Sequence, residues 1–454
     1  MNRPPPAASI VLAVAGGFAT GVAVAALGVD RGPVVMALVP VAAAGLCLAL
    51  RDPRMAVGGV LVSPSVGLQP VAGGMQVVQA LGVLAVGVVV ARGLLLRVGT
   101  HARPTLLWAG ALVTWTLVAT IPSEQFLTSV RVDLNVLLGL GLCASSAAAH
   151  RSVTDLRLAL SCWCVGTLTV VLPALTGVGG MSSQYGGALV QGRLTGPFVQ
   201  PNEFGCFCMV GLFVALALVL LSPSGPVRVL GAVTMVAGAL GLVFSLSRGS
   251  WLGTALGLAA VLVLRPSLWR GFAAITAGAV LTAAVLLWAT PLSTAAGVVA
   301  DRVGSLANPT GNPDDRRDLV FSEAARLAVE SPWVGYGPGS FKVKAEEADS
   351  IVFAYHRLHA HNVLLHVAAE AGFVAVALLL GLTAATAAAV RRTVRGPNSG
   401  KGRSAGAAAA LGGGCAAVAG QGLVDVTFQN PLLMALLWTL LGLTLAACRP
   451  AGTP

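Results

Sequence analysis

Long apolar segments follow one another along most of this chain, and the short loops between them hold most of its charge. A segment of about 20 apolar residues can cross a bilayer as a helix, and a helix satisfies its own backbone hydrogen bonds there. The chain has 454 residues, of which 56% are hydrophobic and 10% are charged. Soluble domains carry about 25% charged residues. The sequence therefore predicts an all-α, polytopic integral membrane protein.

Fourteen segments are candidate transmembrane helices: 9–28, 34–50, 55–70, 76–96, 105–121, 127–149, 158–178, 204–221, 229–246, 250–264, 271–290, 363–390, 405–422 and 432–448. Four of them, 34–50 with 55–70 and 229–246 with 250–264, are short enough to be re-entrant or broken helices. The expected number is therefore twelve to fourteen. The first segment lacks a convincing small-x-small cleavage site, which favours a transmembrane helix over a signal peptide.

The expected organisation has four parts. They are N-terminal transmembrane helices over 1–120, a transmembrane core with outer-face arginine motifs over 121–290, one large extracytoplasmic loop containing short helices over 291–361, and C-terminal transmembrane helices over 362–454.

Basic residues in the short loops fix the expected orientation. Alternation of the spans places one set of loops on a single side: Arg51 and Arg54, Arg97 and Arg103, Arg151 and Arg157, Arg228, Arg265 and Arg270, and the run from Arg391 to Arg403. Loops rich in Arg and Lys face the cytoplasm. Both termini are then cytoplasmic, and segment 291–361 lies outside the cell membrane. The net charge of +11 reflects this asymmetry, so nucleic acid is not an expected partner.

Five of the arginines that fall outside the cytoplasmic set are candidate site residues: Arg131, Arg193, Arg248, Arg316 and Arg317. All are expected at or just above the outer headgroup level. A guanidinium binds phosphate oxygens in bidentate fashion and keeps its charge. These side chains are therefore candidate ligands for a lipid-linked phosphate. The alternative is that they snorkel to the headgroups or lie on solvated surfaces.

Four of the six histidines fall between His356 and His366, where the outer loop re-enters the membrane. Imidazole exchanges a proton near neutral pH, so His361, at the expected start of a helix, is the candidate base or substrate-binding group. The alternative is that His361 is a helix-terminal residue whose side chain forms a hydrogen bond with the backbone. His359 and His366 are expected to be packed polar residues. Asp425 faces the same side and can orient an arginine or bind a sugar hydroxyl.

The large loop contains an amphipathic run from Asp314 to Glu330 with acids in its first turn, as a helix start favours. Ser331-Pro332 ends it. A glycine-rich turn follows and is expected to place Trp333, Tyr336 and Phe341, and a second short helix is expected over 344–355.

Four motifs occur in order along the chain. They are Gly192-Arg193-Leu-Thr-Gly196 with Asn202, Ser247-Arg248-Gly249, Glu330-x-Pro332-x-x-Gly335-x-Gly337-x-Gly339-x-Phe341, and His361-Asn362-x-x-Leu365 with Glu370-x-Gly372. Together they resemble the O-antigen ligase and O-antigen polymerase family of bacterial membrane glycosyltransferases, over roughly residues 120 to 445.

This resemblance implies transfer of a glycan from a polyprenyl diphosphate carrier, such as undecaprenyl diphosphate, to a glycan, lipid or protein acceptor on the outer face. It places outer-face arginines on the diphosphate and the histidine of the His-Asn-x-x-Leu motif near the reacting sugar. Arg193, Arg248, Arg131, Arg316, Arg317, Asn362 and Asp425 are the expected substrate-binding residues, and His361 is the expected catalytic base. Direct attack inverts the anomeric centre. No Asp-x-Asp pair is present, so neither a metal nor another cofactor is expected.

Two other classes of function remain open at this level. A transporter or flippase would place charge near the middle of the membrane, whereas the charges here gather at the outer face. A scaffold protein would not require outer arginines together with histidine. Polymerase and ligase activities are not separated by the sequence, and the glycan and the acceptor are not named by it.

Overall fold

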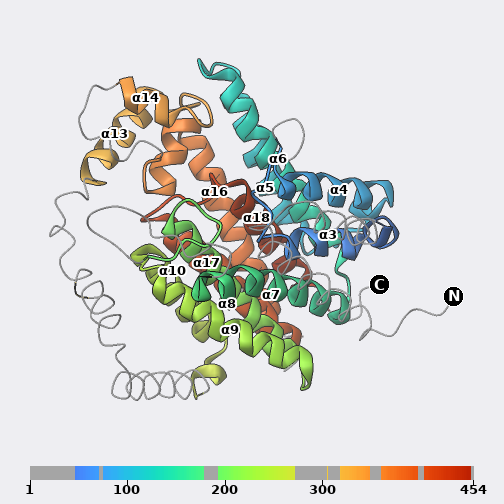
Figure 1. Ribbon diagram of the computed structural model, residues 1–454. Helices are drawn as coiled ribbons and strands as arrows, with labels where there is room; N and C mark the ends of the chain where they lie inside the picture. The colour runs from blue at the N-terminus through green and yellow to red at the C-terminus, as the bar shows by residue number, and fades with distance from the viewer. Residues whose placement is uncertain are drawn as a thin grey trace, which may run out of the picture.

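The computed structural model describes residues 47–70, 75–177, 193–270, 304, 317–347, 359–396 and 403–450. Within these ranges the regular elements are helices (Figure 1). They are α3 (Pro53–Val62), α4 (Val77–Ala91), η2 (Leu94–Arg97), α5 (Arg103–Thr120), α6 (Phe126–Ala149), α7 (Val153–Thr176), α8 (Pro201–Leu221), α9 (Pro226–Phe244), α10 (Arg248–Leu264), η4 (Pro266–Leu268), α13 (Arg317–Glu330), α14 (Phe341–Glu347), α16 (Val363–Arg395), α17 (Arg403–Gly422) and α18 (Pro431–Ala447).

Length and composition allow five of these helices to cross a membrane, namely α6, α7, α8, α9 and α16. Four shorter apolar helices, α3, α4, α10 and α18, accompany them. The prediction of an all-α polytopic membrane protein is confirmed. The expected spans 9–28 and 271–290 and most of 34–50 lie outside the described residues, so the total of twelve to fourteen stays a prediction.

Small residues bring α10 and α17 into close contact. A Cβ added to Gly253 would lie 2.5 Å from the carbonyl oxygen of Ala417, and one added to Gly257 would lie 2.5 Å from that of Gly413. Glycine and alanine allow helix backbones to approach in this way inside membranes. The contact brings the first turn of α10 beside the segment that follows α17.

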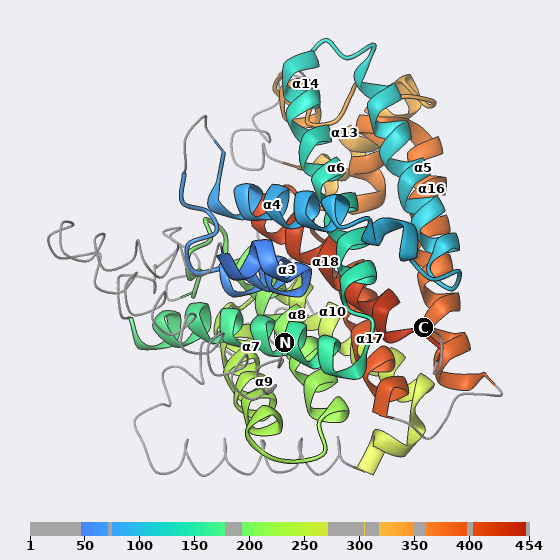
Figure 2. The same cartoon turned by 90° about the vertical axis from the view of Figure 1, so that its right-hand side faces the viewer.

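Helices α13 and α14 pack on the beginning of α16. Figure 2 shows α5, α6 and α16 side by side, with α13 and α14 gathered at one end of them. An apolar cluster joins α13 and α14 to the start of α16; its buried members are Val320, Ala324, Leu327, Phe341, Ala345, Ala360 and Ala369. The amphipathic helix expected after Asp314 is confirmed over Arg317–Glu330. The second short helix begins earlier than expected, at Phe341, and residues 348–358 lie outside the description.

The glycine-rich turn between α13 and α14 is bonded into a kink of α16. Gly372 has a φ of +74° inside this helix, and a Cβ there would lie 2.0 Å from the carbonyl oxygen of Trp333. Phe373 N donates to Pro332 O at 2.8 Å, and Gly337 N donates to Glu370 O at 2.8 Å. These backbone hydrogen bonds hold the glycine-rich turn against α16, beside the apolar cluster that contains Phe341. Trp333 itself remains exposed.

Candidate active site

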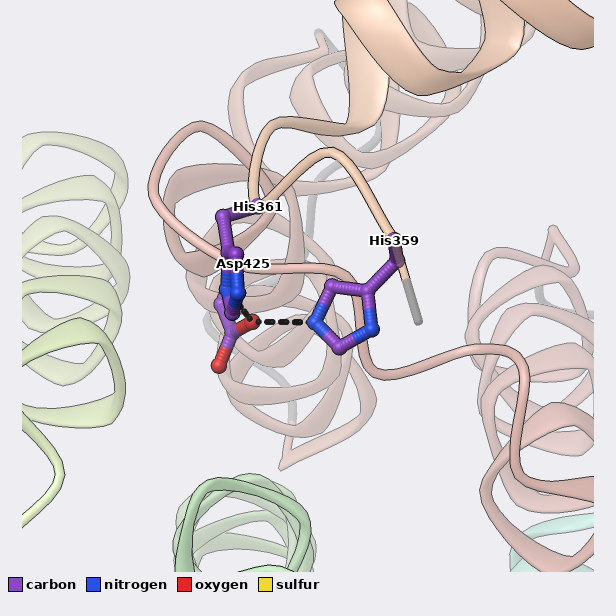
Figure 3. A group of neighbouring side chains, drawn as sticks. All are labelled: His359, His361 and Asp425. Carbon is purple, nitrogen blue, oxygen red and sulfur yellow. Dashed lines mark hydrogen bonds and ion pairs between the residues drawn. The ribbon is translucent and has the colours of Figure 1, made fainter. Parts of the chain in front are cut away.

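Two histidines share one carboxylate oxygen at the start of α16. His359 Nε2 lies 3.1 Å from Asp425 Oδ1, and His361 Nδ1 lies 3.0 Å from the same atom. Figure 3 shows both imidazole rings directed at this carboxylate. Asp425 belongs to the connection between α17 and α18, and its backbone neighbour Val426 N also donates to Oδ1, at 2.9 Å. His359 and Asp425 are buried, and His361 is nearly so.

Local backbone structure places these three side chains. His361 adopts a φ of +49°, a left-handed conformation in which histidine is more frequent than most residues. Asn362 then caps α16, because its side-chain oxygen accepts from Leu364 N at 2.9 Å and Leu365 N at 3.1 Å. The Asn362 amide also donates to Leu423 O at 3.0 Å. This residue therefore ties the start of α16 to the segment that carries Asp425.

Burial and hydrogen bonding set the protonation of the cluster. Burial alone would raise the pKa of Asp425, but hydrogen bonds from His359 and His361 and attraction to these rings lower the pKa well below its usual range. The pKa of His361 is lowered mainly by burial; the Asp425 hydrogen bond opposes this shift, while repulsion from His359 and Arg317 adds to it. At neutral pH the aspartate is ionised and His361 is neutral. Donation from Nδ1 to Asp425 leaves Nε2 of His361 as the proton acceptor.

Arg248 begins α10, and the first turn of this helix approaches the segment that carries Asp425. Ser247 caps this helix by accepting from Ser250 N at 3.3 Å. A Cβ on Gly249 would lie 3.1 Å from the Val424 side chain and 3.9 Å from Cβ of Asp425. The Ser247-Arg248-Gly249 motif therefore approaches the Asp425 segment closely because its glycine has no side chain.

Arg193 and Arg317 reach the same region from different parts of the chain. Arg193 is buried; its Nε donates to Ser245 O at 2.9 Å and its Nη2 to Asn202 Oδ1 at 2.9 Å. Arg317 begins α13 and donates to Val424 O at 2.8 Å. Four of the expected site residues, Arg248, Arg317, His361 and Asp425, thus gather at one place, and Arg193 braces the turn that precedes Arg248.

The remaining expected residues are less central. Arg131 lies on the exposed face of α6, where its carbonyl accepts from the Asn135 amide at 3.1 Å. The described contacts do not join it to the cluster. Arg316 lies outside the described residues. Asn362 has a structural role as the cap of α16, and its contact with substrate stays a prediction.

The family model described as O-antigen ligase matches residues 233–380. The match supports an O-antigen ligase domain over these residues. No curated protein matches the chain. The resemblance found in the motifs is confirmed, and glycan transfer of the O-antigen ligase or polymerase type is supported in general.

The O-antigen ligase domain extends from α9 into the first half of α16. It contains Arg248, Arg317 and His361. Asp425 and Arg193 lie outside the matched residues. The site therefore combines residues of the domain with Arg193, which precedes α8, and Asp425, which follows α17.

Two polar residues of this site, His359 and Glu203, were not among the expected site residues, and His359 was expected to be a packed polar residue. His359 makes the same contact with Asp425 as His361 does, with ring centroids 4.3 Å apart. Glu203, in the first turn of α8, interacts electrostatically with both His359 and Asp425. The acid directly after the Pro201-Asn202 pair at a helix start was the available signal for Glu203.

The same three side chains have the composition of a metal site. One ligand atom from each of His359, His361 and Asp425 lies within 4.8 Å of the others. Ligands at about 2.1 Å from a tetrahedral metal ion would be about 3.4 Å apart, close to the 3.1 and 3.0 Å that separate Asp425 Oδ1 from the two histidine nitrogens. The donor set therefore fits a divalent cation as well as a hydrogen-bonded cluster, and metal independence stays a prediction.

Proposed function

We propose that the protein transfers a glycan from a polyprenyl diphosphate carrier, such as undecaprenyl diphosphate, to an acceptor hydroxyl at the outer face of the cell membrane. The observation that carries this proposal is the His361–Asp425 pair beside Arg248 and Arg317, within and next to an O-antigen ligase domain. A base and several guanidinium groups in one place suit the two demands of this reaction, which are removal of a proton and stabilisation of a diphosphate.

His361 is the proposed general base. Nε2 takes the proton of the acceptor hydroxyl while the acceptor oxygen forms a bond to the anomeric carbon. The bond between that carbon and the diphosphate oxygen breaks, and its electron pair leaves with the lipid diphosphate. This single displacement inverts the anomeric centre. Asp425 holds the Nδ1–H tautomer and stabilises the imidazolium that forms.

Arginines stabilise the leaving diphosphate in this scheme. Arg248 and Arg317 border the Asp425 segment and are the proposed direct ligands, and Arg193 contributes from the adjoining turn. Arg131 and Arg316 are assigned to the approach of the carrier at the outer surface, and Asn362 to a contact with the bound glycan. The acceptor is a glycan, a lipid or a protein, and the partners include the surrounding membrane lipids.

Purified protein incubated with lipid-linked oligosaccharide tests the proposal. General-base catalysis contributes about 10²–10⁴-fold, so His361→Ala should lose that factor in turnover while donor binding stays within a few-fold of the wild type. His101→Ala is a matched control, because His101 bonds Leu445 O near the end of α18. Turnover close to wild type in His361→Ala, or parallel loss of donor binding, would contradict the base assignment. Transbilayer movement of the donor without product would identify a flippase instead.

A further inference from the structure

Two buried hydrogen-bond acceptors beside the cluster have no partner among the described residues. Glu203 receives hydrogen bonds from the Asn430 side chain and the Gln200 backbone, yet its Oε2 is buried and unpartnered. Gln421, 1% exposed, directs its amide nitrogen toward Asn202 O at 3.5 Å and leaves Oε1 unpartnered. A buried acceptor without a donor destabilises the folded state, so both atoms suit a ligand that brings donors.

Both acceptors adjoin the proposed diphosphate and base residues. Gln421 lies one helical turn before Asp425, whose N–H donates to Gln421 O at 2.9 Å. Its side chain borders Gly249 of the arginine motif, since a Cβ there would lie 3.7 Å from Gln421 Cγ. Glu203 follows Asn202, which holds Arg193, and faces His359 and Asp425 electrostatically. The α8 side of the site therefore presents acceptors next to arginines.

The chemistry of the missing partner follows from these neighbours. A carboxylate oxygen and an amide oxygen both require donors. Arg193 and Arg248 nearby make a cation a poor occupant, because like charges repel at short range. Neutral hydroxyl groups donate hydrogen bonds without adding charge, and a sugar ring carries several of them at fixed spacing.

We propose that Glu203 Oε2 and Gln421 Oε1 form a subsite for hydroxyl groups of the donor's first sugar, the ring attached to the diphosphate. This inference rests on the proposed function. The first sugar must lie next to the diphosphate ligands and within reach of His361, and the α8 side of the cluster meets both conditions. The subsite would orient the anomeric carbon toward His361.

Binding of two probes separates this subsite from the diphosphate site. One probe is polyprenyl diphosphate without sugar, and the other is the lipid-linked glycan extracted from cells that lack the protein. Glu203→Gln and Gln421→Met keep side-chain volume while removing the charge or the acceptor. Each should weaken binding of the lipid-linked glycan by about tenfold and change binding of the bare diphosphate by less than twofold. Retained binding of the bare diphosphate also reports that the variants are folded.

Glu124→Gln serves as a control for Glu203→Gln, because Glu124 is exposed and pairs with Lys344. It should alter neither affinity. Equal loss for both probes, or no loss for either, in Glu203→Gln and Gln421→Met would overturn the subsite. Arg248→Ala, by contrast, should weaken both probes. Unchanged binding of the bare diphosphate to Arg248→Ala would count against the proposed function, whatever the two subsite variants do.

Discussion

Two carboxylate clusters lie far apart in this molecule, and they differ in the partner that each carboxylate has. At the start of α7, Asp155 accepts from Arg54 Nη1 at 2.6 Å, and Arg54 also pairs with Asp52. In the second cluster, Asp425 accepts from two imidazoles. Arginine keeps its proton at any physiological pH, whereas histidine exchanges it. The first cluster can only hold helices together, while the second can also move a proton.

The two clusters also differ in how the sequence assembles them. Asp52 and Arg54 are neighbours at the start of α3, and Asp155 belongs to the capping box of α7 with Ser152. The second cluster joins residues 64 and 66 positions apart. Asp155 lies at the start of α7, and Val170 lies about 23 Å further along the same helix. Val170 borders Gly196, which follows Arg193 in the chain, so the first cluster is well separated from the turn that holds Arg193. The first cluster thus combines two local contacts with one long-range pair, since Arg54 and Asp155 lie 101 positions apart, whereas both histidine contacts of the second cluster depend on tertiary packing.

The cluster at Asp155 and the cluster at Asp425 are expected to lie on opposite sides of the membrane. Val329 on α13 and Leu96 on η2 are both exposed. In a Cys47→Ser background, which removes the exposed natural cysteine, Val329→Cys should react fully with an impermeant thiol reagent in intact cells. Leu96→Cys should react only after permeabilisation, because basic loops face the cytoplasm. Labelling of Leu96→Cys alone in intact cells would reverse the orientation and remove the proposed reaction from the outer face.

Removing the charge of Asp425 and that of Asp155 should have different effects on turnover and stability. Asp425→Asn deprives the His361 imidazolium of its counter-charge and admits the wrong tautomer, so turnover should fall by about 10²–10⁴-fold. Asp155→Asn loses a helix cap and an ion pair, and should cost about 1 kcal/mol of folding free energy. Its turnover per folded molecule should stay within twofold of the wild type. Melting temperature and turnover, measured on the same preparations, check both; equal turnover in the two variants would contradict the distinction.

The sequence predicted the helices well because each depends on its own composition. The apolar runs at 127–149 and 204–221 fall on α6 and α8. The motifs supplied Arg248 and His361, and the expected topology added Arg317 and Asp425. The predicted topology puts all four residues on the same side of the membrane. Alternation of spans alone requires that arrangement.

What the sequence did not predict depends on contacts between distant segments. The equivalent contacts of His359 and His361 with Asp425 require the left-handed turn at His361 and the position of Asp425. The kink at Gly372 is filled by the Pro332–Gly337 backbone. The sequence of either segment alone does not predict that the two segments meet. Arg131 shares its expected depth with Arg248 but lies on the exposed face of α6. Depth is predictable from hydropathy, whereas the direction of a side chain around its helix is not.

The pH dependence of transfer should distinguish Asp425, which is paired with histidine, from Asp155, which is paired with arginine. The neutral form of His361 is the base, and burial lowers its pKa below the ordinary value of 6.5. The rate should therefore be constant from pH 8 to about 6.5 and fall about tenfold per pH unit only below the lowered pKa. Asp425 raises this pKa, so the acid limb of Asp425→Asn should move to lower pH. Asp155→Asn should leave the limb unchanged. A limb above pH 6.5 would contradict the assignment of His361.

The smallest expected effect concerns metal ions. If the cluster is hydrogen-bonded, chelation should change turnover by less than twofold, and added Mg²⁺, Mn²⁺ or Zn²⁺ should not raise it. His359→Ala should then cost only about fivefold, the value of one neutral hydrogen bond, because Val426 N and His361 still hold Oδ1 of Asp425. In a metal centre His359 would be one of three ligands, and its loss would abolish activity together with metal binding. Loss on chelation that one cation restores, with an inactive His359→Ala, would make this cluster a metal site. His361 would then be a ligand, and the base would have to lie elsewhere.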